Sequence, residues 1–216
     1  MNFKSNSLGA LLFLNLLPLL AVGQSDEEVS TDPPISHPWA ESFEAPTKIS
    51  SERILLEPLK PIHTELDFKA VASSKEHLRK TLQWGSWPPT DMSEADNRVA
   101  LENHWEEFKN HEAYAYTVLA PNGKTCLGCV YLYPVPSNKR ALSLIFWVTE
   151  DQLKQSLDKH LIEIVIDHVK QIWPVDFVEF PIPIQNERGI QILNEIGLEV
   201  SNEGASQSTF LWSRDD

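Results

Sequence analysis

The stretch FWVTEDQLKQSLDKHLIEIVIDHV, residues 146–169, constrains the fold of this chain most strongly. Its apolar run, which ends at Val148, predicts a buried strand, and the apolar spacing that follows predicts a long amphipathic helix over 151–173. Pro174 then ends the helix. In many coenzyme-binding folds such a junction carries glycines, which let backbone N–H groups approach a phosphate. No glycine lies within 141–176, so the junction has the secondary structure of a phosphate site without its usual residues.

Strands and helices alternate along most of the chain. Apolar runs predict the strands, and helical spacing with capping residues predicts the helices. In chain order they are a strand at 53–59, two short helices within 63–83, a helix at 93–113, strands at 113–121, 124–135 and 141–149, the helix at 151–173, a strand at 175–184, a helix at 186–198 and one or two strands within 199–213. This order predicts one α/β or α+β domain with a mixed sheet over residues 52–216.

The N-terminal part of the chain differs in character from the rest. Residues 1–23 combine Lys4, the apolar run LGALLFLNLLPLLA and small residues before Gln24, which is the layout of a secretory signal peptide. Residues 24–51 are rich in Pro, Ser, Glu and Asp and predict a flexible linker. We therefore expect an exported protein, periplasmic or secreted. The alternative is an uncleaved N-terminal membrane anchor, for which the charge bias still favours an exported domain.

The charge of the chain excludes one class of partner. The formal net charge is −13, and loss of the signal peptide with Lys4 makes it one unit more negative. Such a surface repels phosphate backbones, so we expect no nucleic-acid partner.

Two cysteines form the motif TCLGC, Cys126 and Cys129. The flanking sequence predicts a strand, in which residues three apart point to opposite faces about 10 Å apart along the chain. A disulfide needs Cα atoms within about 7 Å, and redox C-x-x-C pairs usually begin a helix. No His or Cys lies at ligand spacing beside them. The sequence therefore predicts two buried strand cysteines and no metal site.

The element order and two motifs resemble the GNAT superfamily of N-acetyltransferases. NERGIQILNEIGLE, residues 186–199, is similar to the family's C-terminal signature, and CLGCVY, residues 126–131, is similar to a strand of a divergent branch without a glycine-rich coenzyme loop. The resemblance runs from about Arg53 to Trp212. It implies a mostly antiparallel central sheet with helices on both faces. It also implies transfer of an acetyl or other acyl group from acyl-coenzyme A to an amine of a small molecule or peptide.

The resemblance further implies where acetyl-coenzyme A, or another acyl-coenzyme A, would bind. Its pantetheine arm would lie where the strands SLIFWV and FVEFPI separate, which gives Phe146, Trp147, Val148 and Asn186 as candidate cofactor-binding residues. When the family pattern is aligned on Val148, its pyrophosphate-loop residues are replaced in this chain. Leu153 stands at the position of the family's arginine. Lys154, Ser156 and Asp158 stand at the positions of its glycines.

The catalytic groups also depart from the family pattern. Leu193 stands where many members carry a tyrosine that donates a proton to the leaving thiolate. Glu179, on the second of the separating strands, is a candidate base, and the alternative, which its position on a strand favours, is an exposed strand carboxylate. His104, with Glu107 three residues on, is the other candidate base, or a helix histidine packed beneath a loop. Aromatic side chains could line an acceptor pocket or belong to the core, namely Trp84, Trp87 and Trp105.

Two functions from different classes remain open. One is a GNAT-like N-acyltransferase with a divergent coenzyme loop. The other is an exported non-catalytic module that keeps the fold and binds a ligand or a protein. The absent glycines and the predicted export favour the second function, and the element order with the Asn186 signature favours the first.

Overall fold

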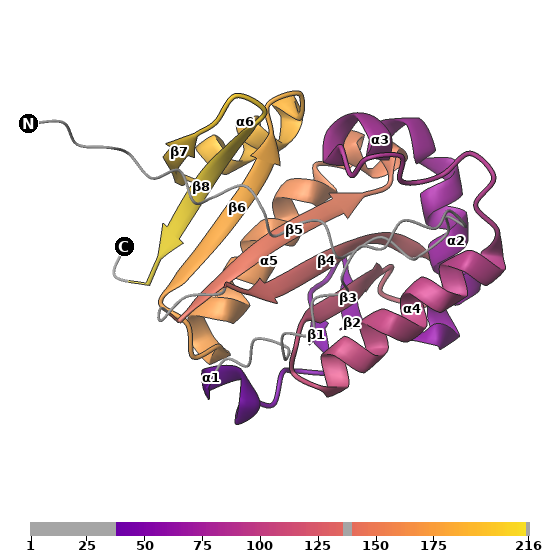
Figure 1. Ribbon diagram of the computed structural model, residues 1–216, viewed down its shortest axis with the longest axis horizontal. Coiled ribbons are helices and arrows are strands. Elements are labelled where there is room, and N and C mark those ends of the chain that lie inside the picture. Colours follow the sequence, from indigo (N-terminus) through magenta and orange to yellow (C-terminus); the bar gives the residue numbers. More distant parts are fainter. Residues whose placement is uncertain (1–37, 136–139, 215–216) are drawn as a thin grey trace, which may run out of the picture. The chain divides into compact units, whose positions relative to one another are not determined.

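The computed structural model describes residues 38–135 and 140–214 (Figure 1). The predicted signal peptide and the first part of the predicted linker lie outside these residues. Within the described part, no helix is long and apolar enough to cross a membrane. The elements are α1 (Pro38–Glu41), β1 (Ile49–Ser50), β2 (Leu55–Pro58), the 3₁₀ helix η1 (Pro61–His63), α2 (Thr64–Ser73), α3 (Lys75–Leu82), α4 (Glu94–Lys109), β3 (Tyr114–Leu119), β4 (Cys126–Pro134), β5 (Ala141–Val148), the 3₁₀ helix η2 (Glu150–Gln155), α5 (Leu157–Ile172), β6 (Phe177–Pro183), α6 (Glu187–Glu195), β7 (Glu199–Glu203) and β8 (Gln207–Ser213).

The strands form one sheet in the order β1-β2-β3-β4-β5-β6-β8-β7. Every neighbouring pair is antiparallel except β5 and β6, which run parallel. A parallel pair needs a crossover connection, and α5 provides it (Figure 1). The predicted mixed, mostly antiparallel sheet is therefore confirmed.

The two faces of the sheet carry separate hydrophobic cores, because side chains alternate along each strand. On β5, Leu144 and Phe146 belong to one core, whereas Ile145 and Trp147 belong to the other. Helices α5 and α6 supply buried side chains to the first core, α2 and α3 supply them to the second, and α4 contributes to both. The predicted helices on both faces are thus present.

The junction after β5 departs from the expected single helix over 151–173. Residues 150–155 form the 3₁₀ helix η2, and Ser156 adopts the left-handed conformation, with φ 52° and ψ 40°. The Ser156 N–H donates to the Leu153 carbonyl at 3.0 Å, which closes η2, and α5 then begins at Leu157. The apolar spacing continues across this break, so the sequence pattern did not reveal it.

Residues 38–51 belong to the packed domain rather than to a linker. Ala40, Ala45 and Ile49 are buried, and the Phe43 ring lies 4.8 Å from the Trp173 ring, between centroids. The expected linker over 24–51 is therefore wrong for these residues. Their high content of Pro, Ser and Glu hid the few apolar side chains that anchor them to the first core.

A β-bulge in β4 overturns the predicted orientation of the two cysteines. Val118 pairs with Gly128, but Leu119 pairs with Cys126, so one extra residue lies between them. Cys126 and Cys129 consequently face the same side of the sheet and belong to the second core, whereas Leu127 belongs to the first. Their predicted burial is correct, and both are free thiols.

We predict that Gly128→Ala strongly destabilises the domain. A Cβ at Gly128 would collide with the Trp147 carbonyl oxygen and lie 2.9 Å from the Val148 Cα, and both atoms belong to the backbone of β5. Overpacking of this kind costs about 3 kcal/mol. Gly123→Ala is the control, because its Cβ would meet nothing within 4 Å and only its φ of 70° opposes alanine, at a cost of about 1 kcal/mol. Urea unfolding should separate the two variants, and equal midpoints would contradict this account.

Candidate functional site

A pocket lies where β5 and β6 separate. Their parallel pairing covers only Ala141, Ser143 and the residue between them on β5, although both strands continue beyond it. The pocket at this opening is formed by α3, the end of β5, the junction and α6. Its lining residues are His77, Thr81, Phe146, Trp147, Val148, Leu153, Asp158, Asn186, Arg188, Gly189 and Ile192.

The structure brings the four predicted cofactor-binding residues together. Phe146, Trp147 and Val148 line one side of the pocket from β5, and Asn186 lines it from the start of α6. The Asn186 side-chain oxygen accepts the Gly189 N–H at 2.9 Å and caps α6. This amide therefore already has a structural partner. That the four residues bind a coenzyme stays a prediction.

A carboxylate of the protein itself, that of Asp158, lies at the start of α5. The Asp158 carboxylate is 4% exposed, and its Oδ1 accepts the Lys159 N–H at 2.9 Å. Arg188 donates to both carboxylate oxygens, from Nε at 2.9 Å and from Nη2 at 3.1 Å. Arg188 Nη2 also lies 3.4 Å from Ser156 Oγ. A helix N-terminus favours negative charge, and here the charge is internal.

Ser156 adopts a backbone conformation that glycine favours. It is in the left-handed region at one of the three positions where the resemblance places glycine. Serine adopts this conformation at some cost, since a Cβ crowds the following carbonyl. The left-handed conformation that glycine favours is therefore present at Ser156, and the Asp158 carboxylate lies two residues beyond it.

His77 is the one histidine among the described residues that line the pocket. Burial lowers the pKa of His77 below its usual value, although the negative charges of Glu150 and Asp158 oppose this shift. Ser74, at the start of α3, fixes the helix beside the junction because its Oγ accepts the Glu150 N–H at 3.0 Å. A neutral imidazole at neutral pH can accept a proton, so His77 is suited to act as a base.

The two bases proposed from the sequence lie elsewhere. The His104 Nδ1 is 3.0 Å from Glu107 Oε2, and its ring packs 5.4 Å from the Tyr131 ring. Glu179 is half-buried and pairs with Ser143 at the end of the parallel ladder. Neither residue lines the pocket.

The other sequence candidates are packed against the cores. Leu193 is fully buried on α6 and presents no proton donor. Trp84 contacts Trp87, with ring centroids 5.3 Å apart, and both pack on the second core, while Trp105 packs on the first. None of the three tryptophans lines the pocket.

Sequence reasoning missed His77 and Arg188 for different reasons. His77 lies on α3, and only the packing of α3 beside β5 and α6 places it at the junction. Arg188 could have been found from the sequence. It follows the capping Asn186 by two residues, and the acidic Asp158 stands where the resemblance places a glycine. A charge gained at one position and matched by an opposite charge in a second motif can indicate an ion pair.

Comparisons with known proteins agree with this fold. The model of the GNAT acetyltransferase domain matches residues 53–199, which is more than half of the chain. The chain therefore belongs to the GNAT acetyltransferase family. No curated protein matches the sequence.

Solved structures of acetyltransferases share the fold at low sequence identity. RimL, the ribosomal L7/L12 α-N-protein acetyltransferase in complex with coenzyme A, superposes with a TM-score of 0.67 at 13% identity, covering 77% of this chain and 97% of that one. A ribosomal-protein-S5-alanine acetyltransferase from Vibrio fischeri gives 0.66 at 13% identity, covering 79% and 98%. The microcin C7 self-immunity acetyltransferase MccE, in complex with acetyl-CoA and AMP, gives 0.66 at 12% identity, covering 78% and 97%.

Proposed function

We propose that this protein is an N-acyltransferase that moves an acyl group from acyl-coenzyme A to an amine of a small molecule or peptide. The observation that carries the proposal is the pocket at the β5–β6 opening, which His77 lines together with the four predicted coenzyme-binding residues. Family membership supports the reaction class. Two of the similar structures are complexes, one with coenzyme A and one with acetyl-CoA, which supports the donor.

Several residues in and beside the pocket have roles in this proposal. The backbone of residues 146–148 holds the pantetheine arm, and Arg188 with the left-handed turn at Ser156 faces the pyrophosphate. His77 takes a proton from the amine as its nitrogen bonds to the thioester carbonyl carbon. The C–S bond then breaks, and the leaving thiolate takes its proton from the His77 imidazolium because Leu193 cannot donate one.

The coenzyme fits this site only if Arg188 releases the Asp158 carboxylate. The Asp158 carboxylate now occupies the start of α5 and engages Arg188 through two hydrogen bonds. A bound pyrophosphate needs the Lys159 N–H and the Arg188 guanidinium, which the Asp158 carboxylate now engages. In our proposal Arg188 therefore exchanges Asp158 for phosphate when coenzyme binds, which weakens binding relative to a site with a free cation.

An assay of acyl transfer tests this function. The purified chain is incubated with acetyl-CoA and a panel of primary amines and peptides with free N-termini, and acetylated products are detected by mass. We expect one class of amine to be acetylated at a rate that saturates with acetyl-CoA. The absence of enzyme-dependent product across the panel, in a sample shown to bind coenzyme, would remove the catalytic proposal.

A non-catalytic, ligand- or protein-binding module is the second candidate. The Asp158–Arg188 pair and the apolar Leu193 favour it, because one fills the expected anion site and the other removes a proton donor. This candidate predicts no binding of coenzyme even at millimolar concentration. We further propose export through residues 1–23, which a mature chain beginning at Gln24 in the secreted fraction would support.

A further inference from the structure

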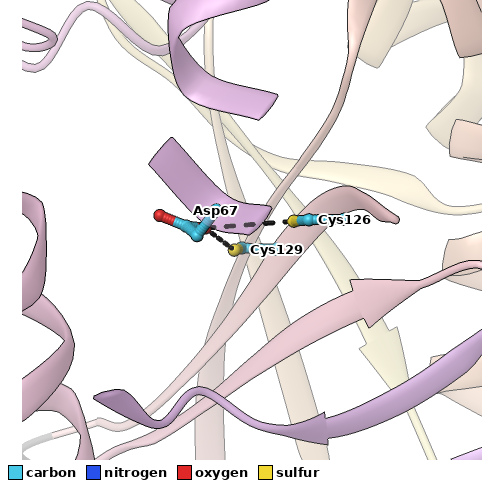
Figure 2. A group of neighbouring side chains, drawn as sticks. All are labelled: Asp67, Cys126 and Cys129. Atoms are coloured by element: carbon cyan, nitrogen blue, oxygen red, sulfur yellow. Dashed lines mark hydrogen bonds between the residues drawn. The ribbon is translucent and has the colours of Figure 1, made fainter. Parts of the chain in front are cut away.

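A buried carboxylate and two thiols converge on the face of the sheet that carries the second core (Figure 2). Asp67 comes from α2, and Cys126 and Cys129 come from the bulged segment of β4. The Asp67 Oδ1 lies 3.3 Å from Cys129 Sγ and 4.0 Å from Cys126 Sγ. All three candidate ligand atoms lie within 4.8 Å of one another.

The surrounding groups hold these three side chains in place. The Asn97 amide, from α4, donates to Asp67 Oδ2 at 3.0 Å and leaves Oδ1 directed at the sulfurs. The Thr117 hydroxyl, from β3, donates to Cys126 Sγ at 3.5 Å. Each of the three side chains is at most 4% exposed. Outer hydrogen bonds of this kind orient ligands and are typical of metal sites.

We propose that Asp67, Cys126 and Cys129 bind a divalent zinc ion. Thiolate and carboxylate ligands lie about 2.3 and 2.1 Å from zinc, so neighbouring ligand atoms of a tetrahedral site are about 3.5–3.8 Å apart. The two sulfur–oxygen distances fall on either side of this range and require movements of only a few tenths of an ångström. A water molecule or Thr117 Oγ1 takes the fourth position. Binding breaks two S–H bonds, forms two Zn–S bonds and releases two protons.

The arrangement favours a metal over a disulfide. Oxidation of the two thiols to a disulfide would remove the sulfur-bound hydrogen that Cys129 directs at Asp67. Among the described residues, the buried carboxylate would then keep only its Asn97 partner on Oδ2, and an unpaired buried acceptor is costly. Zinc instead satisfies the carboxylate and both sulfurs together. The site would tie α2 to the bulge of β4, independently of acyl transfer at the β5–β6 pocket.

Metal analysis of the purified whole chain tests the proposal. The chain is produced with zinc present and purified without chelators, and its zinc content is measured. Reconstitution with Co²⁺ then reports thiolate ligands through a sulfur-to-cobalt charge-transfer band. We expect one zinc per chain and a band of the intensity given by two thiolates. We also expect a lower Tm after removal of the metal and recovery on adding zinc.

Variants assign the ligands. Cys129→Ser and Asp67→Asn should each weaken zinc binding at least about tenfold. Asp167→Asn, an exposed carboxylate on α5, should leave it unchanged. If a ligand variant fails to fold, the unaltered chain still decides the question. Less than a tenth of an equivalent of zinc after dialysis against zinc buffer would overturn the proposal. So would an intact mass lower by two hydrogen atoms, which would show a disulfide.

Discussion

His77→Ala is expected to lower kcat by about 10²- to 10⁴-fold, the usual contribution of a general base. His77 lines the pocket beside the predicted coenzyme residues, and burial lowers its pKa, so its imidazole is neutral and able to accept a proton at neutral pH. Alanine removes this acceptor without changing the backbone of α3. KM for the acyl donor should change little, because His77 acts in proton transfer and is not among the groups proposed to hold the donor. Steady-state kinetics with saturating donor measures both constants.

The pH dependence gives the same prediction an independent readout. A base works only when it is deprotonated, so kcat/KM, calculated on the concentration of the unprotonated amine, should fall as pH decreases through the pKa of His77. That pKa lies below the usual 6.5. The acid limb should therefore lie below pH 6.5 and vanish in His77→Ala. His104→Ala is the matched control and should alter kcat less than twofold, since His104 is engaged by Glu107 away from the pocket. A large loss in His104→Ala with little in His77→Ala would reverse the assignment.

Opposite effects on coenzyme affinity are expected from Asp158→Asn and Arg188→Ala. Asp158→Asn keeps the size of the side chain and removes the negative charge that competes with phosphate. Coenzyme binding should therefore tighten about tenfold, because the loss of one repulsive contact is worth about 1–2 kcal/mol. Arg188→Ala leaves the carboxylate in place and removes the cation, so binding should weaken about tenfold or more. Calorimetric titration with desulfo-coenzyme A measures both changes.

Asp167→Asn controls for net charge in this comparison. It makes the same change of charge on the same helix, at an exposed position outside the pocket, and should leave affinity unchanged. Asp158→Asn will also lose stability, by about 1–3 kcal/mol, because the Arg188 ion pair is broken. Titrations therefore belong well below the unfolding temperature. Weaker binding in a folded Asp158→Asn variant would show that Asp158 supports the coenzyme site and does not compete for it.

Local patterns predicted most of the fold because most elements follow them. The continuous apolar run of β5 and the division of residues 63–83 into two short helices are visible in the sequence, and the structure confirms both. The errors occur where one residue changes the geometry of its neighbours. The bulge at Leu127 reverses the side on which Cys126 lies, and the left-handed Ser156 divides the expected long helix.

The sequence predicted the residues that β5 and the start of α6 contribute to the candidate site, but not the residue that α3 contributes. Residues 146–148 and Asn186 could be placed by resemblance, because they follow a strand and begin a helix of the family's signature. His77 reaches the pocket through long-range packing of α3, which no local spacing encodes. The Asp158–Arg188 pair joins two motifs 30 residues apart in the sequence. It also explains physically how an anion site at this junction is satisfied without glycines.

Titration of the unaltered chain with desulfo-coenzyme A decides whether the β5–β6 pocket binds coenzyme, on which every role proposed there depends. Our account predicts one site per chain with micromolar affinity and a matching rise in Tm. No heat and no thermal stabilisation at millimolar ligand would contradict the account and leave the binding module as the better description of the protein.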